Sequence, residues 1–259
     1  MRFTKGHGTG NDFVILPDLD GALDLTPERV AALCDRRRGI GADGVLRVVR
    51  SAAATDAPEG PEFFMDYRNS DGSLAEMCGN GARVFVRYLL EQGLAGGSKL
   101  EFGSRAGVIT AVADGDEIAV AMRRPAIVGQ SSAMLGALQL AGQAVDIGNP
   151  HLVCRVPDVD IVDLRDAPRF DAAFFPAGVN VEVISGDASL TRMRVYERGS
   201  GETLSCGTGA CAVAAVVLGG ADGTVPVEVP GGRLTITIEP DRCWLAGPAV
   251  LVAHGDVLI

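Results

Sequence analysis

Apolar and polar residues alternate along several short stretches of this chain. The alternation is clearest at residues 108–112 (VITAV) and 234–238 (LTITI). Successive side chains of a strand point to opposite faces of a sheet, so this period of two predicts half-buried β-strands. Further short runs rich in apolar residues also predict strands, at residues 44–48, 100–103, 180–184 and 227–230.

Helical signals are fewer than strand signals. Thr26 is followed by Pro27 and Glu28, which gives the cap residue, first-turn proline and acid of a helix start. The arginines at residues 36–38 and the glycine after them predict the end of that helix. Residues 51–61 are rich in alanine, proline and acids and predict a surface loop.

Two stretches are near copies of each other, and each is built around a cysteine. Residues 77–82 read MCGNGA and residues 205–210 read SCGTGA, and an apolar run follows both. In each copy the cysteine stands where a glycine-rich turn would lead into a helix. Unpaired amides at a helix start carry partial positive charge, which stabilises a thiolate and can also hold a carboxylate.

Other features repeat in the same order along the chain. Asn11 recurs as Asn149 after 138 residues, strand 44–48 recurs as strand 180–184 after 136, and Cys78 recurs as Cys206 after 128. Residues 66–69 and 195–198 stand at similar distances before the two cysteines. So long a period indicates two homologous domains from an internal duplication.

The domain boundary follows from this repeat. We expect domains at residues 1–124 and 125–259, with a hinge within residues 124–143. The last strand, near residues 250–259, is expected to return to the first domain.

Composition limits the partners. The formal net charge of −10 argues against nucleic acid. No apolar run approaches the ~20 residues of a membrane span. The first residues, MRFTKGH, lack the apolar segment of a signal peptide, so a cytoplasmic location is expected, with the six cysteines as thiols.

No metal or organic cofactor is expected. Paired Cys/His spacings typical of metal sites do not occur. Lys5 and Lys99 are the only lysines, and neither lies in a recognisable motif for a pyridoxal phosphate Schiff base. No glycine-rich nucleotide fingerprint follows a strand-like run.

A pair of thiols suits a stereoinversion. Duplicated domains that face each other across a pseudo-twofold axis would place Cys78 and Cys206 on opposite walls of one cleft. One thiolate would remove a proton from a carbon acid, and the other thiol would return one on the opposite face. A helix N-terminus can lower a cysteine pKa from about 8.5, so one thiol could serve as a base near neutral pH. Amides at the two helix starts could stabilise the carbanion.

The sequence resembles the diaminopimelate epimerase family. Members of this family are cofactor-independent amino-acid epimerases of lysine and peptidoglycan precursor biosynthesis. The resemblance covers essentially the whole chain. It is carried by residues 8–13 (GTGNDF), 41–44 (GADG), 68–72 (RNSDG), 77–83 (MCGNGAR), 148–151 (GNPH), 178–180 (GVN), 196–199 (YERG) and 206–209 (CGTG).

The resemblance implies a role for each matching residue. It implies that Cys78 and Cys206 are the catalytic acid/base pair that interconverts LL- and meso-2,6-diaminopimelate, and that His151 and Glu197 tune the thiol pKa values. It implies substrate contacts from Asn11, Asn69, Gly79, Asn80, Asn149, Asn180, Glu197, Arg198, Gly207 and Thr208. These groups suit a substrate with an amino-acid head at both ends, because arginine can clamp a carboxylate while glutamate accepts from an ammonium.

The same resemblance implies the fold class and the assembly. The fold class is α+β, in which each domain is a mixed/antiparallel β-barrel-like sheet around a central helix, with the active site in the cleft between the domains. A homodimer is implied as well. The sequence departs from some relatives at Gly44, where they carry an amide side chain.

Two other functions remain open. A proline or hydroxyproline racemase or epimerase of the same fold would also use two cysteines, but its one-carboxylate substrate needs no second clamp. A thiol redox or binding protein would use the same pair as a reversible disulfide. Cys34, Cys154, Cys211 and Cys243 lack the turn context and are interpreted as buried thiols.

Overall fold

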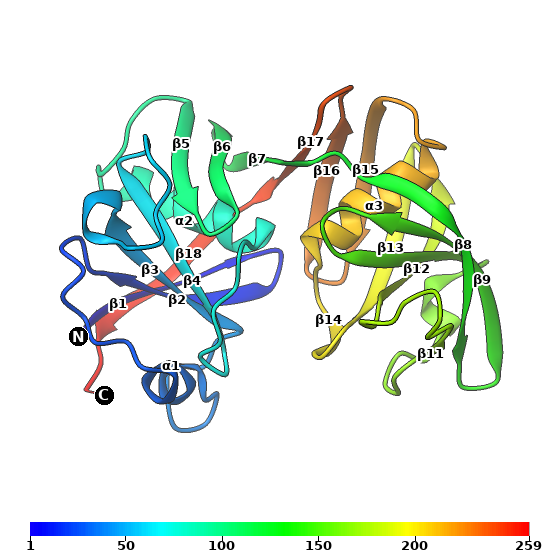
Figure 1. The fold of residues 1–259 in the computed structure, drawn as a ribbon, viewed down its shortest axis with the longest axis horizontal. Coiled ribbons are helices and arrows are strands. Elements are labelled where there is room, and N and C mark those ends of the chain that lie inside the picture. The colour runs from blue at the N-terminus through cyan, green and yellow to red at the C-terminus, as the bar shows by residue number, and fades with distance from the viewer. Residues whose placement is uncertain (259) are drawn as a thin grey trace. The chain divides into compact units, whose positions relative to one another are not determined.

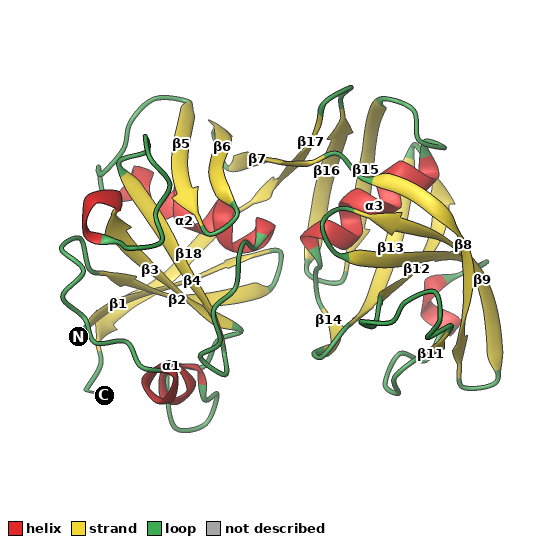
Figure 2. Ribbon diagram, in the orientation of Figure 1, coloured by secondary structure: helices red, strands yellow, loops and turns green. Residues whose placement is uncertain are grey.

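The structure, a computed structural model, describes residues 1–258. Strands dominate it (Figure 2), so the expected α+β class holds only in part: this part of the chain is mostly β, with three α-helices. The helices are α1 (Pro27–Cys34), α2 (Gly79–Glu91) and α3 (Gly207–Val217). The strands are β1 (Arg2–Gly8), β2 (Asn11–Pro17), β3 (Gly44–Arg50), β4 (Phe63–Asn69), β5 (Lys99–Ser104), β6 (Gly107–Asp114), β7 (Glu117–Arg123), β8 (Ala126–Leu135), β9 (Leu138–Asp146), β10 (Pro150–Arg155), β11 (Arg169–Phe170), β12 (Asn180–Asp187), β13 (Leu190–Glu197), β14 (Gly201–Thr203), β15 (Gly223–Val229), β16 (Gly232–Ile238), β17 (Arg242–Pro248) and β18 (Val250–Asp256).

The sequence signals locate these elements well. All six predicted strands coincide with strands of the structure, β3, β5, β6, β12, β15 and β16, although the stretch 227–230 extends one residue past the end of β15. Helix α1 begins after Thr26, whose hydroxyl accepts from the amide of Arg29, and has Pro27 in its first turn. It ends at Cys34, just before the arginines that predicted its end.

The chain forms two compact units. The first contains residues 1–120 and 247–259, and the second contains residues 121–246. The chain leaves the first unit within β7 and returns to it within β17. Strand β18 pairs with β1 antiparallel, and the N-terminal amine donates to the carbonyl of Val257, so both ends of the chain belong to the first unit.

The prediction of a hinge within residues 124–143 is wrong. Most of those residues belong to β8 and β9, which pair with each other antiparallel inside the second unit. Glycine, serine and alanine in this stretch resemble a linker, but β8 is half-exposed and needs few large apolar residues.

Strand pairing follows the same order in both units. In the first unit the order is β18-β1-β2-β3-β4-β5-β6-β7, in which β2–β3 and β4–β5 are parallel and all other pairs are antiparallel. In the second unit the order is β8-β9-β10-β12-β13-β15-β16-β17, in which β10–β12 and β13–β15 are the parallel pairs. Two identical series of mixed pairings support the interpretation of an internal duplication.

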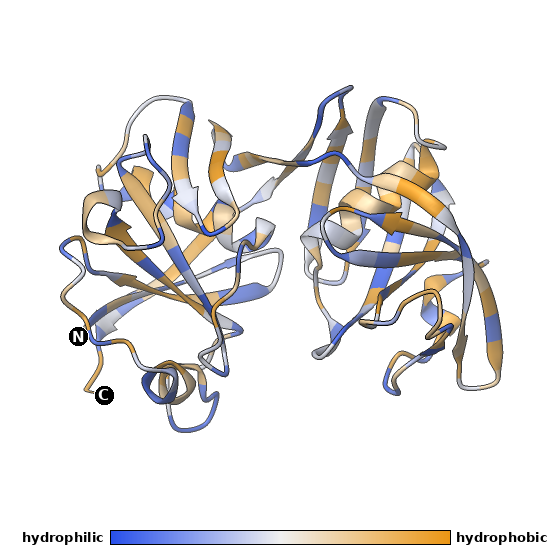
Figure 3. Ribbon diagram, viewed as in Figure 1, coloured by the Kyte–Doolittle hydropathy of each residue, from blue (hydrophilic) through white to orange (hydrophobic). Residues whose placement is uncertain are grey.

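A single helix lies at the centre of each unit (Figure 1). Helix α2 contacts β18 and β1 at one end of its strand order and β6 near the other, so the sheet curves around it. Helix α3 has the same relation to β8, β9 and β16. Figure 3 shows α3 coloured apolar over most of its length, as expected of a helix that is buried on nearly all sides. None of the helices among the described residues is long and apolar enough to cross a membrane.

Candidate functional site

Each central helix begins at one of the two repeated cysteines. Cys78 and Cys206 are the N-cap residues of α2 and α3, and both have extended backbone angles. The sulfur of Cys78 accepts from the amide of Gly81 at 3.4 Å, and that of Cys206 accepts from Gly209 at 3.4 Å. Sulfur is a weak acceptor, and serine, threonine or aspartate would cap better. The choice of cysteine at both caps therefore points to reactivity.

The Cys78 thiol faces an amide oxygen. Its Sγ donates to Oδ1 of Asn11 at 3.6 Å, and Nδ2 of Asn80 donates to the same oxygen at 3.3 Å. Asn11 is held in this orientation because its Nδ2 donates to Asp43 at 2.7 Å. The first unit thus presents an acceptor to its cysteine.

Charged side chains hold Asp43 and the strand next to it in place. Arg36 donates to both Asp12 and Asp43 at 2.7 Å, and Lys5 pairs with Asp12 at 2.6 Å. Burial opposes the ionisation of Asp12, but hydrogen bonds from Arg36 and Lys5 outweigh it and hold the pKa of its carboxyl below the usual range. Arg36, interpreted from the sequence only as a helix end, therefore supports the Asn11 side of the site.

The Cys206 thiol is more enclosed. Cys206 is 5% exposed, and its Sγ lies 3.5 Å from Oγ1 of Thr208. Burial raises the pKa of this thiol well above its usual value, with a further rise from the nearby carboxyl groups of Glu197 and Glu182. Hydrogen bonds from Thr208 and Gly209 act in the opposite direction. The expected lowering by the helix start is thus outweighed by burial at this cysteine, which favours its protonated form.

His151 does not touch Cys206 directly. Its Nδ1 lies 2.6 Å from Oε1 of Glu182, and its Nε2 lies 3.1 Å from Oδ1 of Asn149. Glu182 was missed by the sequence analysis. The available signal was an acid inside the apolar strand NVEVI, because an acid buried in a strand requires a partner.

The remaining predicted substrate residues are held by local hydrogen bonds. Asn180 donates to the carbonyl of Pro150 at 3.0 Å and accepts from the amide of Arg198 at 2.9 Å. Asn69 bonds Tyr67 and Ser73, each at 3.0 Å. Arg198 donates to the carbonyl of Ala177 at 2.8 Å, and Glu197 accepts from the hydroxyl of Thr203.

Gly44 occupies the position that corresponds to Asn180. Phe13 pairs with Gly44 in the first unit as His151 pairs with Asn180 in the second. A Cβ on Gly44 would lie 2.5 Å from the carbonyl oxygen of Arg68 and 2.8 Å from the ring of Tyr67. Close packing of the strands therefore explains the glycine, and no side chain reaches the site from here.

Arg83 is a second residue that the sequence analysis missed. It is fully buried on α2, where it donates to Oγ1 of Thr9 at 3.2 Å and to the carbonyl of Gly79 at 3.4 Å. Thr9 has a φ of 51°, in the left-handed region. Arg83 thus fixes the β1–β2 turn against the helix start that carries Cys78.

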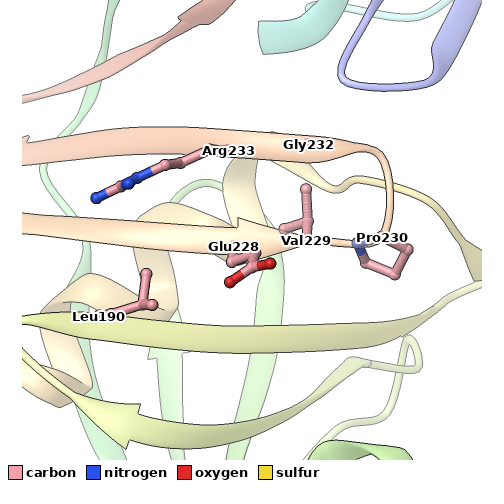
Figure 4. A pocket seen from close by; sticks show the side chains of 6 residues that line it. All are labelled: Leu190, Glu228, Val229, Pro230, Gly232 and Arg233. Atoms are coloured by element: carbon pink, nitrogen blue, oxygen red, sulfur yellow. The ribbon is translucent and has the colours of Figure 1, made fainter.

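One surface pocket and two further thiols among the described residues show no link to Cys78 or Cys206. A surface pocket beside the β15–β16 hairpin (Figure 4) is lined by Leu190, Glu228, Val229, Pro230, Gly232 and Arg233, none of which was predicted as a site residue. Burial raises the pKa of Cys34 to about 11 and that of Cys154 to about 12, as expected of inert structural thiols.

Known structures share this fold. A phenazine biosynthesis protein of the PhzF family from Bacillus anthracis is similar at a TM-score of 0.71 and 16% identity, over 100% of this chain and 99% of that one. A hydroxyproline epimerase from Agrobacterium vitis is similar at a TM-score of 0.68 and 13% identity, over 98% of this chain and 91% of that one. The chain therefore shares its fold with these proteins, one of which is named a hydroxyproline epimerase.

Sequence comparisons identify the family to which this chain belongs. The family model for diaminopimelate epimerase matches residues 3–128 and 143–257. A diaminopimelate epimerase of Thermobifida fusca is 54% identical over 99% of this chain and 98% of its own length, and one of Mycolicibacterium smegmatis is 50% identical over 99% and 97%. The chain belongs to the diaminopimelate epimerase family, and it is an isomerase, as the sequence predicted.

Proposed function

We propose that this chain interconverts LL- and meso-2,6-diaminopimelate in lysine and peptidoglycan precursor biosynthesis, with Cys78 and Cys206 as its acid/base pair. The observation that carries the proposal is the cysteine cap on each central helix, each accepting from an amide at 3.4 Å. Membership in the diaminopimelate epimerase family supports the choice of substrate.

The proposed step moves one proton in and one proton out. A thiolate takes the α-hydrogen as a proton, the C–H electron pair stays on the substrate as a carbanion, and the opposite thiol gives its proton to the other face. After one turnover the two sulfurs have exchanged protonation states. Burial raises the pKa of Cys206, so we propose that Cys206 is the protonated partner in the resting enzyme.

The substrate contacts remain proposals. Amides at Gly79-Asn80 and Gly207-Thr208 are proposed to hold the reacting carboxylate, because unpaired amides at a helix start favour an anion. Glu197 and Arg198 are proposed to bind the distant amino-acid head. Asn11, Asn69, Asn149 and Asn180 are proposed to complete the contacts, although in this structure their side chains also serve local hydrogen bonds.

A homodimer is proposed as the working assembly. Strand β18 pairs on one side with β1, and its Val250 and Val252 are 43% and 54% exposed. Exposed apolar residues on an outer strand are usually covered by another element or chain. Light scattering on purified protein tests this: a mass of twice 26.8 kDa supports it, and a single chain mass contradicts it.

Substrate choice is tested with the purified enzyme and reductant, without pyridoxal phosphate. The enzyme is incubated separately with LL-diaminopimelate, with L-proline and with trans-4-hydroxy-L-proline, and the isomers are separated by chiral chromatography. Formation of meso-diaminopimelate alone supports the proposal. Turnover of proline or hydroxyproline alone would support the alternative racemase, and no turnover of any would favour a thiol redox or binding role.

A further inference from the structure

Beneath the helix start that carries Cys206 lies a buried acid–histidine pair. The side chains of His151 on β10 and Glu182 on β12 are both 0% exposed, and Nδ1 of His151 lies 2.6 Å from Oε1 of Glu182. Parallel pairing of β10 with β12 brings the two residues together. Burying such polar groups costs free energy unless their hydrogen bonds are satisfied, so the pair requires an explanation.

Hydrogen bonds connect this pair to the cysteine. Nε2 of His151 lies 3.1 Å from Oδ1 of Asn149, whose Nδ2 donates to Oγ1 of Thr208 at 3.4 Å. Oγ1 of Thr208 lies 3.5 Å from Sγ of Cys206. We call this series, from Glu182 through His151, Asn149 and Thr208 to Cys206, the Cys206 chain.

The hydrogen bonds of the Cys206 chain are all donated in the same direction, from His151 towards Cys206. Because Asn149 donates through Nδ2 to Thr208, its Oδ1 faces His151 as an acceptor, so Nε2 of His151 carries a proton. Thr208 accepts from Asn149 and thereby has its own hydroxyl proton available for the sulfur of Cys206. A hydrogen bond donated to sulfur favours its thiolate form.

Glu182 sets this direction from the far end. Its Oε2 is buried and has no hydrogen-bond partner among the described residues. Burial raises the pKa of this carboxyl, with an opposing effect from His151. A neutral Glu182 carboxyl that donates to Nδ1 of His151 leaves the proton of the imidazole ring on Nε2. The remaining hydrogen bonds of the Cys206 chain require this position of the proton.

The first unit shows that the fold does not need this pair. Its corresponding positions hold Phe13 and Leu46. A Cβ on Gly81 of α2 would lie 3.2 Å from Cδ2 of Leu46, and one on Gly209 of α3 would lie 2.7 Å from Oε1 of Glu182. An apolar pair therefore fills the same space, and polar groups at such positions are often no more stabilising than apolar ones.

We propose that Glu182 is a positioning residue, which acts through His151 and Asn149 to direct the hydroxyl of Thr208 onto the sulfur of Cys206. The inference rests on the proposed catalytic role of Cys206. In the proposed reaction Cys206 must carry the thiolate after it has given up its proton, and the Cys206 chain stabilises that state.

Direct electrostatic repulsion predicts the opposite change in the pKa of Cys206 when Glu182 is removed. The carboxyl groups that act on Cys206 are those of Glu197 from β13 and Glu182 from β12. His151 from β10 lies against Glu182. An ionised Glu182 would raise the pKa of Cys206 by repulsion, so its removal would make the thiolate easier to form. In the Cys206 chain its removal makes the thiolate harder to form.

The experiment compares four variants with the wild-type enzyme. Glu182→Gln keeps a donor beside Nδ1, and Glu182→Leu removes it. The double variant His151→Phe/Glu182→Leu copies the apolar pair of the first unit. Glu228→Gln, at an exposed position on β15, is the matched control. Alkylation rates of Cys78 and Cys206 are measured by peptide mass spectrometry across pH, beside kcat, KM and the melting temperature.

The proposal predicts that Glu182→Leu slows alkylation of Cys206 at neutral pH about tenfold while that of Cys78 is unchanged, because a lost hydrogen bond lowers the thiolate fraction. kcat falls about 10–100-fold with little change in KM. Glu182→Gln restores both to within about threefold. The double variant melts at the wild-type temperature or above, yet stays slow.

The proposal is wrong if Glu182→Leu alkylates Cys206 at the wild-type rate or faster, or if the double variant regains wild-type kcat once it is stable. These outcomes are separate from failure of the proposed function, because wild-type enzyme that does not epimerise diaminopimelate leaves the alkylation comparison intact.

Discussion

At the residue scale, the two capping cysteines are the clearest departure from what stability alone would select. Serine makes a better N-cap than cysteine, because oxygen accepts an amide hydrogen bond more strongly than sulfur. The sulfur of Cys78 and that of Cys206 each accept from a helix amide at 3.4 Å. Their proposed use as acid and base explains a residue that capping does not.

Serine substitution separates capping from chemistry. Cys78→Ser and Cys206→Ser should each keep the wild-type melting temperature, because the hydroxyl still caps the helix. Each should lose about 10²–10⁴-fold in kcat, because a serine hydroxyl does not ionise near neutral pH. Chiral chromatography and differential scanning fluorimetry on the same samples check this. Near-wild-type kcat in either variant would refute the two-base scheme.

Glu182 should also make stability depend on pH. Its pKa is raised in the folded state by burial, so the carboxyl favours folding below its unfolded pKa of about 4.3 and loses that contribution as pH rises through the folded value. Relative to wild type, Glu182→Gln should therefore gain stability as pH increases. Urea midpoints at about pH 5 and about pH 8 measure the difference. A constant difference between the two pH values would contradict this assignment.

The sequence predicted the site residues unevenly. The sequence predicted those site residues that stand in a repeated motif, namely Cys78, Cys206, Asn11 and Asn149. Glu182 was not predicted, since a strand sequence does not show which neighbour packs against an acid inside it. Its partner His151 lies 31 residues away and reaches it only through parallel strand pairing.

At the element scale, α2 and α3 are equivalent central helices that pack against different side chains. Both begin at a cysteine and are buried by the strands of their own unit. Beneath α2 lie Phe13 and Leu46, and beneath α3 lies Glu182. The two helix starts therefore differ most in the polarity of what they rest on.

That difference predicts unequal effects of one added methyl group. In Gly81→Ala the new Cβ meets side-chain carbons at 3.2 and 3.4 Å, which can shift slightly. In Gly209→Ala it meets a buried carboxyl oxygen at 2.7 Å. Gly209→Ala should cost about 1–3 kcal/mol more in the free energy of unfolding, because overpacking also displaces a buried polar group. Urea unfolding compares the two variants, and equal losses would contradict the prediction.

Secondary structure was predictable where a local pattern specifies it. The helix start at Thr26 and the strands at residues 108–112 and 234–238 follow from capping and from alternation. The hairpin β8–β9 was mistaken for a hinge, because a half-exposed hairpin and a linker share small and polar residues.

At the scale of the whole molecule, the duplicated pairing order explains why the last strand belongs with the first. Strand β18 takes the place in the first unit that β8 takes in the second, at the start of the strand order. The carbonyls of Pro248 and Ala249 accept from Arg83 and Arg87 of α2. The sequence predicted the duplication from ordered motifs, whereas the order of strand pairing required the structure.

Truncation tests this dependence. A chain that ends at Pro248 lacks β18 and should lose amide-exchange protection across β1, β2 and α2, because β1 loses its antiparallel partner. Strands and helix of the second unit should keep their protection. A chain that ends at Val257 is the control, since Leu258 is 98% exposed. Hydrogen exchange with peptide mass spectrometry reads both, and unchanged protection in the shorter chain would contradict the assignment.

The measurement that tests the central claim most directly is proton exchange at the substrate α carbon. LL-diaminopimelate is incubated in D2O with wild-type enzyme and reductant, without pyridoxal phosphate, and with Cys78→Ala and Cys206→Ala as controls. The two-base account predicts that wild type forms meso-diaminopimelate with deuterium at the inverted α carbon, and that neither variant forms it. Absence of deuterium from the meso product, or full epimerisation by either variant, would contradict the account.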